Sequence, residues 1–177
     1  MADKEQKTIY NIYGLFGVTL ALSIVPTISA ASICLVFFLV TLIAAYVLRG
    51  RAEENSLIEN HMTYVIRTVW IVSLLSVVTV GLATLYMLPR IDYTAFQSCA
   101  DAIAGQGVAA LEAMGMAELQ ALTQPCVSDF VNMNHNTLLM AALIGGVPLI
   151  LYMGYRFAKG VSRAAKGYRL ANPKSWV

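Results

Sequence analysis

The chain has 177 residues, of which 58% are hydrophobic and only 12% are charged. Soluble domains carry roughly 25% charged residues, and they need charge spread over the whole surface. In this chain the charges are clustered and leave long uncharged stretches, which argues against a soluble globular protein. The formal net charge of +2 says little, but the positions of the basic residues along the chain are informative.

Four apolar runs predict transmembrane helices at about 10–28, 30–48, 69–88 and 137–157. Each run is long enough to cross the roughly 30 Å hydrocarbon core of a bilayer. None contains Asp, Glu, Lys or Arg before its terminal flank. The turn at 26–29 is short, so the first two helices should form a tight hairpin. The sequence therefore predicts an all-α membrane protein with a single membrane domain over residues 1–177.

The first run also has the layout of a cleaved signal peptide. Lys4 and Lys7 precede the apolar stretch, and the small residues Ser29, Ala30 and Ala31 follow it. The second run begins almost at once and leaves little room for a signal peptidase. We therefore expect the first helix to be retained.

The basic residues predict the orientation in the membrane. Eleven of the twelve lie in the N-terminal tail, in the 49–68 connection, or from Arg156 to the C-terminus, whereas the 89–136 loop contains only Arg90. Lys and Arg accumulate in cytoplasmic connections of membrane proteins. We expect both termini and the 158–177 tail in the cytoplasm, and the 89–136 loop outside.

The outer loop contains Cys99 and Cys126, which the predicted topology places on the oxidising side of the membrane. A disulfide between them closes a loop worth about 3 kcal/mol in the chain-entropy model. We interpret it as a structural staple, with a redox switch as the less favoured alternative. The intervening residues, which include Ala109, Ala110 and Leu111, form helices well, so a short helical hairpin stapled at its base is expected.

His135 lies among asparagines just before the fourth run. A metal site needs three or four convergent ligands, so we interpret His135 as a polar cap at the membrane interface. The sequence offers no candidate catalytic residues, metal ligands or cofactor-binding residues. We therefore do not expect an enzyme.

The cytoplasmic connection runs without Gly or Pro from residue 56 into the third apolar run, which predicts a continuous helix. Several of its polar and aromatic residues recur at helical spacing and form a candidate interaction face. In the competing structural interpretation, Arg67 extends to the interface while His61 and Tyr64 cap neighbouring helices. The candidate face comprises Glu59, His61, Tyr64, Arg67, Thr68 and Trp70.

A basic stripe follows the fourth run at spacings of three, four and three residues. This pattern predicts a basic amphipathic helix that lies on anionic lipid headgroups. Binding of nucleic acid is the other use of such a stripe, and it is disfavoured because the membrane already supplies an acidic partner. The predicted headgroup contacts are Arg156, Lys159, Arg163 and Lys166.

Three stretches carry a family resemblance: Ile43–Gly50, Glu59–His61 together with Ile66–Trp70, and Asn172–Trp176. They resemble a widespread family of small bacterial four-helix integral membrane proteins of unknown function, which has been likened to the chloroplast inner-envelope protein-import component. The resemblance implies a bacterial inner (plasma) membrane and transfers no catalytic residues. The long cysteine-containing loop departs from the short connection that the resemblance implies.

These observations favour an accessory or assembly subunit that contacts another membrane protein, or a second copy of itself, within an anionic bilayer. Small residues such as Gly14 and Gly17 allow helices to approach closely. The alternative is an oligomeric channel or transporter for a small solute or peptide. Its polar residues would be Thr41, Ser73, Ser76 and Thr79.

Overall fold

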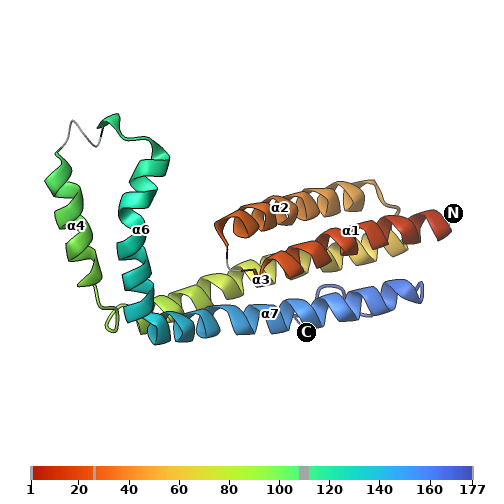
Figure 1. The fold of residues 1–177 in the computed structure, drawn as a ribbon. Coiled ribbons are helices and arrows are strands. Elements are labelled where there is room, and N and C mark those ends of the chain that lie inside the picture. The colour runs from red at the N-terminus through yellow and green to blue at the C-terminus, as the bar shows by residue number, and fades with distance from the viewer. Residues whose placement is uncertain (1, 26, 108–111, 177) are drawn as a thin grey trace. The chain divides into compact units, whose positions relative to one another are not determined.

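The computed structural model describes residues 2–25, 27–107 and 112–176, and it confirms the all-α class (Figure 1). Pro26 and Ala109–Leu111 lie outside the described residues. The chain divides into two compact units, one formed by residues up to 78 and from 146 onward, the other by residues 79–145. The helices are α1 (Ala2–Leu22), α2 (Ile28–Arg51), α3 (Leu57–Met87), α4 (Ala95–Gln106), α6 (Met116–Met133) and α7 (His135–Ala165).

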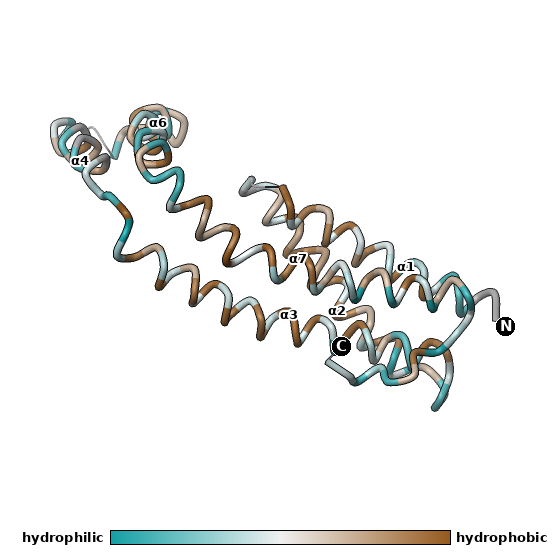
Figure 2. The backbone as a smooth tube through the Cα atoms, turned by 90° about the horizontal axis from the view of Figure 1, so that it is seen from below, coloured by the Kyte–Doolittle hydropathy of each residue, from teal (hydrophilic) through white to brown (hydrophobic). Residues whose placement is uncertain are grey.

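Three of the described helices, α2, α3 and α7, are long and apolar enough to cross a membrane. Hydrophobic residues recur along all of them (Figure 2). The sequence predicts a fourth span at 10–28, but α1 ends at Leu22 and its first turns carry charges. Its apolar part from Thr8 to Leu22 is about 22 Å long at 1.5 Å per residue. That is shorter than the roughly 30 Å hydrocarbon core.

The tight hairpin of α1 and α2 is present (Figure 1). The Thr27 hydroxyl accepts a hydrogen bond from the backbone N–H of Ala30 at 3.1 Å and caps the start of α2. Arg49 and Arg51 occupy the last turn of α2, where their charge is favourable beside the negative end of the helix dipole. The sequence thus encodes both ends of this helix.

The core of the first unit is built around one stripe of α1. Ile9, Ile12, Tyr13 and Phe16 recur at the spacing that places them on one helix face, and all are buried. Residues from the other three helices of the unit pack on this stripe, among them Ala45, Met62, Val65, Met153 and Ala164. Thus α1 is held by the other helices along its inner face.

Helix α7 continues past the predicted end of the membrane span at 157, as the predicted basic helix requires, and ends at Ala165. Gly167 has φ +66°, a left-handed conformation that glycine adopts without a steric penalty. The N–H groups of Gly167 and Tyr168 donate to the carbonyls of Ala164 and Arg163, which is the Schellman pattern of a helix end. The predicted basic helix therefore ends here, and residues 168–176, which we call the return segment, leave the helix axis.

In the second unit, α4 and α6 form the predicted hairpin, and the disulfide joins Cys99 to Cys126 with Cα atoms 5.8 Å apart. The rings of Phe96 and Phe130 pack with their centroids 4.6 Å apart. Gly107 is the C-cap residue of α4, and Gly115 is the N-cap residue of α6. The predicted disulfide and helical hairpin are thus confirmed.

The side chain of Asn134 is buried and pairs with the backbone of Asp92. It accepts from the Asp92 N–H at 2.8 Å and donates to the Asp92 carbonyl at 2.9 Å. The Asp92 carboxylate accepts from the N–H and hydroxyl of Thr94. These donors hold the pKa of Asp92 below its usual range, because they stabilise the ionised form. The pairing fixes the entry into α4.

Gly160 provides a test of the packing between α1 and α7. A Cβ atom at position 160 would lie 2.6 Å from Cζ of Tyr13, whereas one at Gly154 would meet nothing within 4 Å. We expect Gly160→Ala to destabilise the protein by about 1–3 kcal/mol through overpacking, measured as thermal unfolding in detergent. Gly154→Ala is the matched control and should leave stability unchanged or slightly raised. Equal melting temperatures for the two variants would contradict this packing.

Candidate functional site: the junction of α3 with the return segment

The first turns of α3 are buried on every side. Each residue from Asn60 to Ile66 is buried, although the stretch contains four polar or ionisable side chains. Most surface helices bury one stripe and expose the other face. Polar groups in such a place must find partners within the protein, because an unpaired buried group is costly.

The start of α3 is fixed by its own side chains. The Ser56 hydroxyl accepts from the Glu59 N–H at 3.1 Å, and the Glu59 carboxylate accepts from the Asn55 N–H at 2.8 Å. Asn55 has φ 63°, a left-handed conformation that asparagine tolerates better than most residues. Glu59, a member of the predicted interaction face, thus acts as part of the helix cap.

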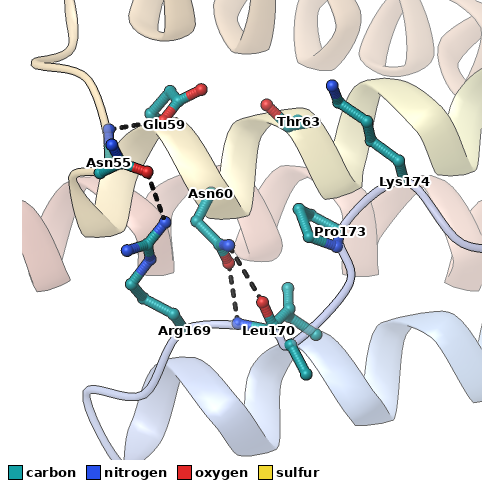
Figure 3. A pocket seen from close by; sticks show the side chains of 9 residues that line it. Asn55, Glu59, Asn60, Thr63, Arg169, Leu170, Pro173 and Lys174 are labelled. Atoms are coloured by element: carbon teal, nitrogen blue, oxygen red, sulfur yellow. Dashed lines mark hydrogen bonds between the residues drawn. The ribbon is translucent and has the colours of Figure 1, made fainter.

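Asn60 attaches the return segment to α3. Its amide nitrogen donates to the Leu170 carbonyl at 3.0 Å, and its amide oxygen accepts from the Leu170 N–H at 2.8 Å (Figure 3). Asn60 and Leu170 are 5% and 4% exposed. One side chain therefore satisfies both backbone groups of a buried residue 110 positions away.

His61 joins α1 to the return segment. Its Nε2 lies 3.1 Å from the Tyr168 carbonyl oxygen, and its Nδ1 lies 3.0 Å from the Tyr13 hydroxyl. The carbonyl can only accept, so Nε2 carries the proton and donates. Neutral His61 then accepts a hydrogen bond at Nδ1 from the Tyr13 hydroxyl. The imidazole, the hydroxyl and the Tyr168 carbonyl each have a hydrogen-bond partner. This arrangement gives His61 a structural role in the core.

Arg156 is fully buried, and its partners are neutral groups. Its Nε donates to the Thr68 hydroxyl at 2.9 Å, and its Nη1 donates to the Ser175 carbonyl at 3.0 Å. The guanidinium carbon lies 3.7 Å from the centre of the Tyr64 ring, within the range of a cation–π interaction. The Tyr64 hydroxyl in turn donates to the Arg156 carbonyl at 3.1 Å. Arg156 thus connects α3, α7 and the return segment.

The end of the return segment is held by two further contacts. The Tyr152 hydroxyl donates to the Trp176 carbonyl at 2.7 Å. The guanidinium carbon of Arg67 lies 5.6 Å from the centre of the Trp176 ring. The segment is therefore attached at Tyr168, Leu170, Ser175 and Trp176, with contacts to both α3 and α7.

A polar cavity of about 470 Å³ opens between α3 and the return segment (Figure 3). Arg169 donates to the Asn55 side-chain oxygen at 3.4 Å at one end, and Lys174 lies at the other. Thr63 is the only buried side chain of the described part of the chain whose polar atom has no hydrogen-bond partner. The cavity has no adjacent set of nucleophile, base and orienting group, but it is suited to binding a small polar group.

The structure divides the predicted interaction face. His61, Tyr64 and Thr68 are buried and bind other parts of the first unit, which is the structural interpretation of this helix. Arg67 and Trp70 are exposed and remain available to a partner. Helical spacing places 61, 64 and 68 on one face, but it does not say whether that face points inward.

The predicted headgroup stripe is divided in the same way. Arg156 is 0% exposed, so its charge is used inside the protein and does not reach the lipid surface. Arg163 and Lys166 are exposed, and the half-buried Lys159 donates to the Tyr155 hydroxyl at 3.1 Å. For these three residues, the headgroup contact stays a prediction.

Three residues of the junction were not predicted from sequence. They are Tyr13, Asn60 and Leu170, of which only Asn60 lies in a stretch that carries the family resemblance. Gly167 is the one local signal for the end of α7, because a glycine just after a basic last turn commonly ends a helix. Among the described residues, no group of three or more His, Cys, Asp or Glu side chains is placed to hold a metal ion, and His135 is exposed.

Comparison of the chain with family models, curated proteins and solved structures gives no match.

The Asn60 pairing predicts how the return segment is held. Asn60→Ala leaves the buried N–H and carbonyl of Leu170 unpaired, which costs about 2 kcal/mol or more. We expect trypsin cleavage after Arg169 and Lys174, followed by mass spectrometry on protein in nanodiscs, to become roughly tenfold faster or more. Asn11→Ala, at an exposed position of α1, is the matched control and should cleave at the wild-type rate. A wild-type rate for Asn60→Ala would show that the pairing does not hold the segment.

Proposed function

We propose that this protein is an accessory or assembly subunit of a membrane, which acts through contacts with another membrane protein. The observation that carries the proposal is the closed polar junction at the start of α3. Four polar side chains are buried at this end of the first unit: Asn60, His61, Tyr64 and Arg156. Their hydrogen bonds are made within the unit, to α3, α7 and the return segment. Because these buried groups are engaged in structural contacts, we place the function on the outer surface of the protein.

The hydroxyls within the apolar helices support the same conclusion. Thr41, Thr68 and Ser73 each donate to the carbonyl four residues earlier in their own helix, at 2.7, 2.8 and 3.0 Å. Thr84 does the same. In a single copy of the chain, hydroxyls bonded in this way have already used their donors within their own helix. A single copy of the chain therefore offers little for conduction.

The apolar exterior supplies the surface for a partner. Only 11% of the most apolar stretch of α2 is buried, as is 11% of that of α7, against 33% for α3. Exposed side chains of α2 include Leu35, Val36 and Ile43, at 58%, 58% and 62%. In a bilayer such helices meet either lipid or another protein, and shape-matched packing is what selects a protein.

In our proposal the protein lies in a bacterial inner membrane with both termini cytoplasmic. The basic ends of α2 and α7 support this orientation, since Lys and Arg favour the cytoplasmic side. The disulfide of the second unit supports an oxidising outer compartment. In this topology α1 enters the membrane as a fourth, shorter helix beside α2.

We also propose kinship with the bacterial four-helix family that the sequence resembles. Two of the stretches that carry the resemblance, Glu59–His61 with Ile66–Trp70 and Asn172–Trp176, meet in the folded chain through the contact of Arg67 with Trp176, and Arg156 of α7 bridges them by donating to Thr68 and Ser175. This contact between the two stretches is a physical reason why a protein that carries one of the two sequence patterns also carries the other.

An oligomeric channel is the second candidate, and one observation favours it. A cavity of about 490 Å³ is lined by apolar residues together with the hydroxyls of Thr19, Ser23, Ser73 and Ser76. Several copies that align such cavities would form a polar path. This function predicts solute flux from the purified protein alone.

Photo-crosslinking in native membranes separates the two functions. A photoreactive amino acid is placed in turn at Leu35, Val36, Ile43, Val77 and Leu85, which are all exposed. The accessory function predicts crosslinks to one other membrane protein from adjacent positions of one helix face, and no solute flux from the purified chain in liposomes. Crosslinks only to lipid and to further copies of the chain, together with flux, would contradict it and establish the channel.

A further inference from the structure

A second, smaller cavity of about 230 Å³ lies beside the end of α2. Its basic lining residues come from three different elements: Arg49 from α2, Arg67 from α3 and Lys174 from the return segment. Among its described lining residues there is no Asp or Glu. Three positive charges that converge without an acid form a site for an anion.

The three basic side chains have no carboxylate partner among the described residues. In the described part of the chain, none of Arg49, Arg67 and Lys174 forms an ion pair. The contact of Arg67 with the Trp176 ring leaves the guanidinium N–H groups available as donors. The three positive charges repel one another, and a bound anion offsets this repulsion.

Thr63 supplies an independent observation. It is 7% exposed, it lines this cavity, and its hydroxyl has no partner among the described residues. Threonines within helices commonly donate to the carbonyl four residues earlier, as Thr41 and Thr68 do here. In Figure 3 the Thr63 hydroxyl and the Lys174 amine lie on the side of α3 away from the Asn60–Leu170 pair. A hydroxyl left without a partner beside three cations is suited to donate to an anionic oxygen.

Two aromatic residues place the cavity at the edge of an apolar zone. Trp70 and Tyr46 line it, and the Trp70 indole donates to the Tyr46 hydroxyl at 2.9 Å. Both are exposed, at 56% and 45%. Trp and Tyr with one apolar and one polar end gather at the level of lipid headgroups. The apolar exterior of α2 and α3 continues from this point, where acyl chains would lie.

We infer that this cavity binds the phosphate of an anionic phospholipid headgroup. The phosphate oxygens contact the basic side chains of Arg49, Arg67 and Lys174. They also accept a hydrogen bond from the Thr63 hydroxyl. The acyl chains follow the exposed apolar surface of α2 and α3. This site is separate from the basic stripe at the end of α7, and it does not depend on the proposed accessory function.

The test uses full-length protein in detergent, titrated with phosphatidylglycerol and, as the neutral lipid, phosphatidylcholine, with bound lipid counted by native mass spectrometry. The cavity variant is Arg49→Gln, Arg67→Gln and Lys174→Gln combined. Its matched control is Lys7→Gln, Arg51→Gln and Arg90→Gln, which removes the same charge from exposed positions that line neither cavity at this junction and lie outside the predicted headgroup stripe. Circular dichroism and the melting temperature show whether each variant is folded.

We expect the cavity variant to lose roughly tenfold or more of its affinity for phosphatidylglycerol, because each basic residue near a headgroup contributes several-fold. The control variant should lose less than about threefold, and phosphatidylcholine binding should be equal in all proteins. Thr63→Val should lower the affinity roughly threefold through the lost hydrogen bond. Arg49→Gln alone is the fallback if the triple variant does not fold, since the Arg49 side chain has no hydrogen bond among the described residues. Its expected loss is about fivefold.

Equal losses in the two triple variants would mean that the lipid responds only to diffuse charge, and would overturn the site. Unchanged affinity in the cavity variant, or in Arg49→Gln, would also overturn it. Inorganic phosphate, compared with chloride at equal ionic strength, distinguishes the source of the anion. If phosphate alone binds the wild type as tightly as the lipid and displaces it, the ligand is free phosphate and the lipid assignment is wrong.

Discussion

The arrangement of the first unit depends on the complete burial of the first turns of α3. Each residue from Asn60 to Ile66 is buried, so polar side chains in this stretch need partners from other parts of the chain, and Thr63 alone among them has none in the described residues. Asn60 meets this demand with the backbone of Leu170, and His61 with Tyr13 and the Tyr168 carbonyl. Burial therefore determines where α1, α7 and the return segment must lie.

The need of buried polar groups for partners is strongest at the guanidinium of Arg156, because this group is charged. A buried charge is tolerated only when its hydrogen-bonding capacity is used, and here a hydroxyl, a carbonyl and an aromatic ring meet that need. Because one of its acceptors is the Ser175 carbonyl, the return segment completes the environment of the charge. The return segment thus supplies a backbone acceptor to the interior of this unit, although its own residues after Leu170 are exposed or half-buried.

Each unit contains a buried asparagine that pairs with both backbone groups of a distant residue. Asn60 pairs with Leu170 in the first unit, and Asn134 pairs with Asp92 in the second. Both fix the path of a chain segment that lies next to a helix end but outside any helix. An amide suits this task because it offers a donor and an acceptor side by side.

Sequence reasoning reached the features that depend on local or compositional signals. The apolar runs located α2, α3 and α7, and the cysteine pair with its good helix formers predicted the stapled hairpin. It failed where the deciding contact is distant in sequence. The spacing of Arg156 and Lys159 is the same whether the stripe faces lipid or the core, and only the long-range contact with Ser175 decides for Arg156. Neither asparagine pairing leaves a pattern in the sequence, because each partner is a backbone group.

The most direct test of this account is hydrogen exchange of the backbone amides of residues 166–176, measured on the wild-type protein in nanodiscs. A docked return segment predicts that the Leu170 amide, held by Asn60, exchanges far more slowly than its neighbour Ala171, and that the Tyr168 amide is protected by Arg163. Uniformly fast exchange from 168 onward would contradict the account. So would continuous helical protection through 170, because it would return the tail to the surface-lying helix that the basic spacing alone predicts.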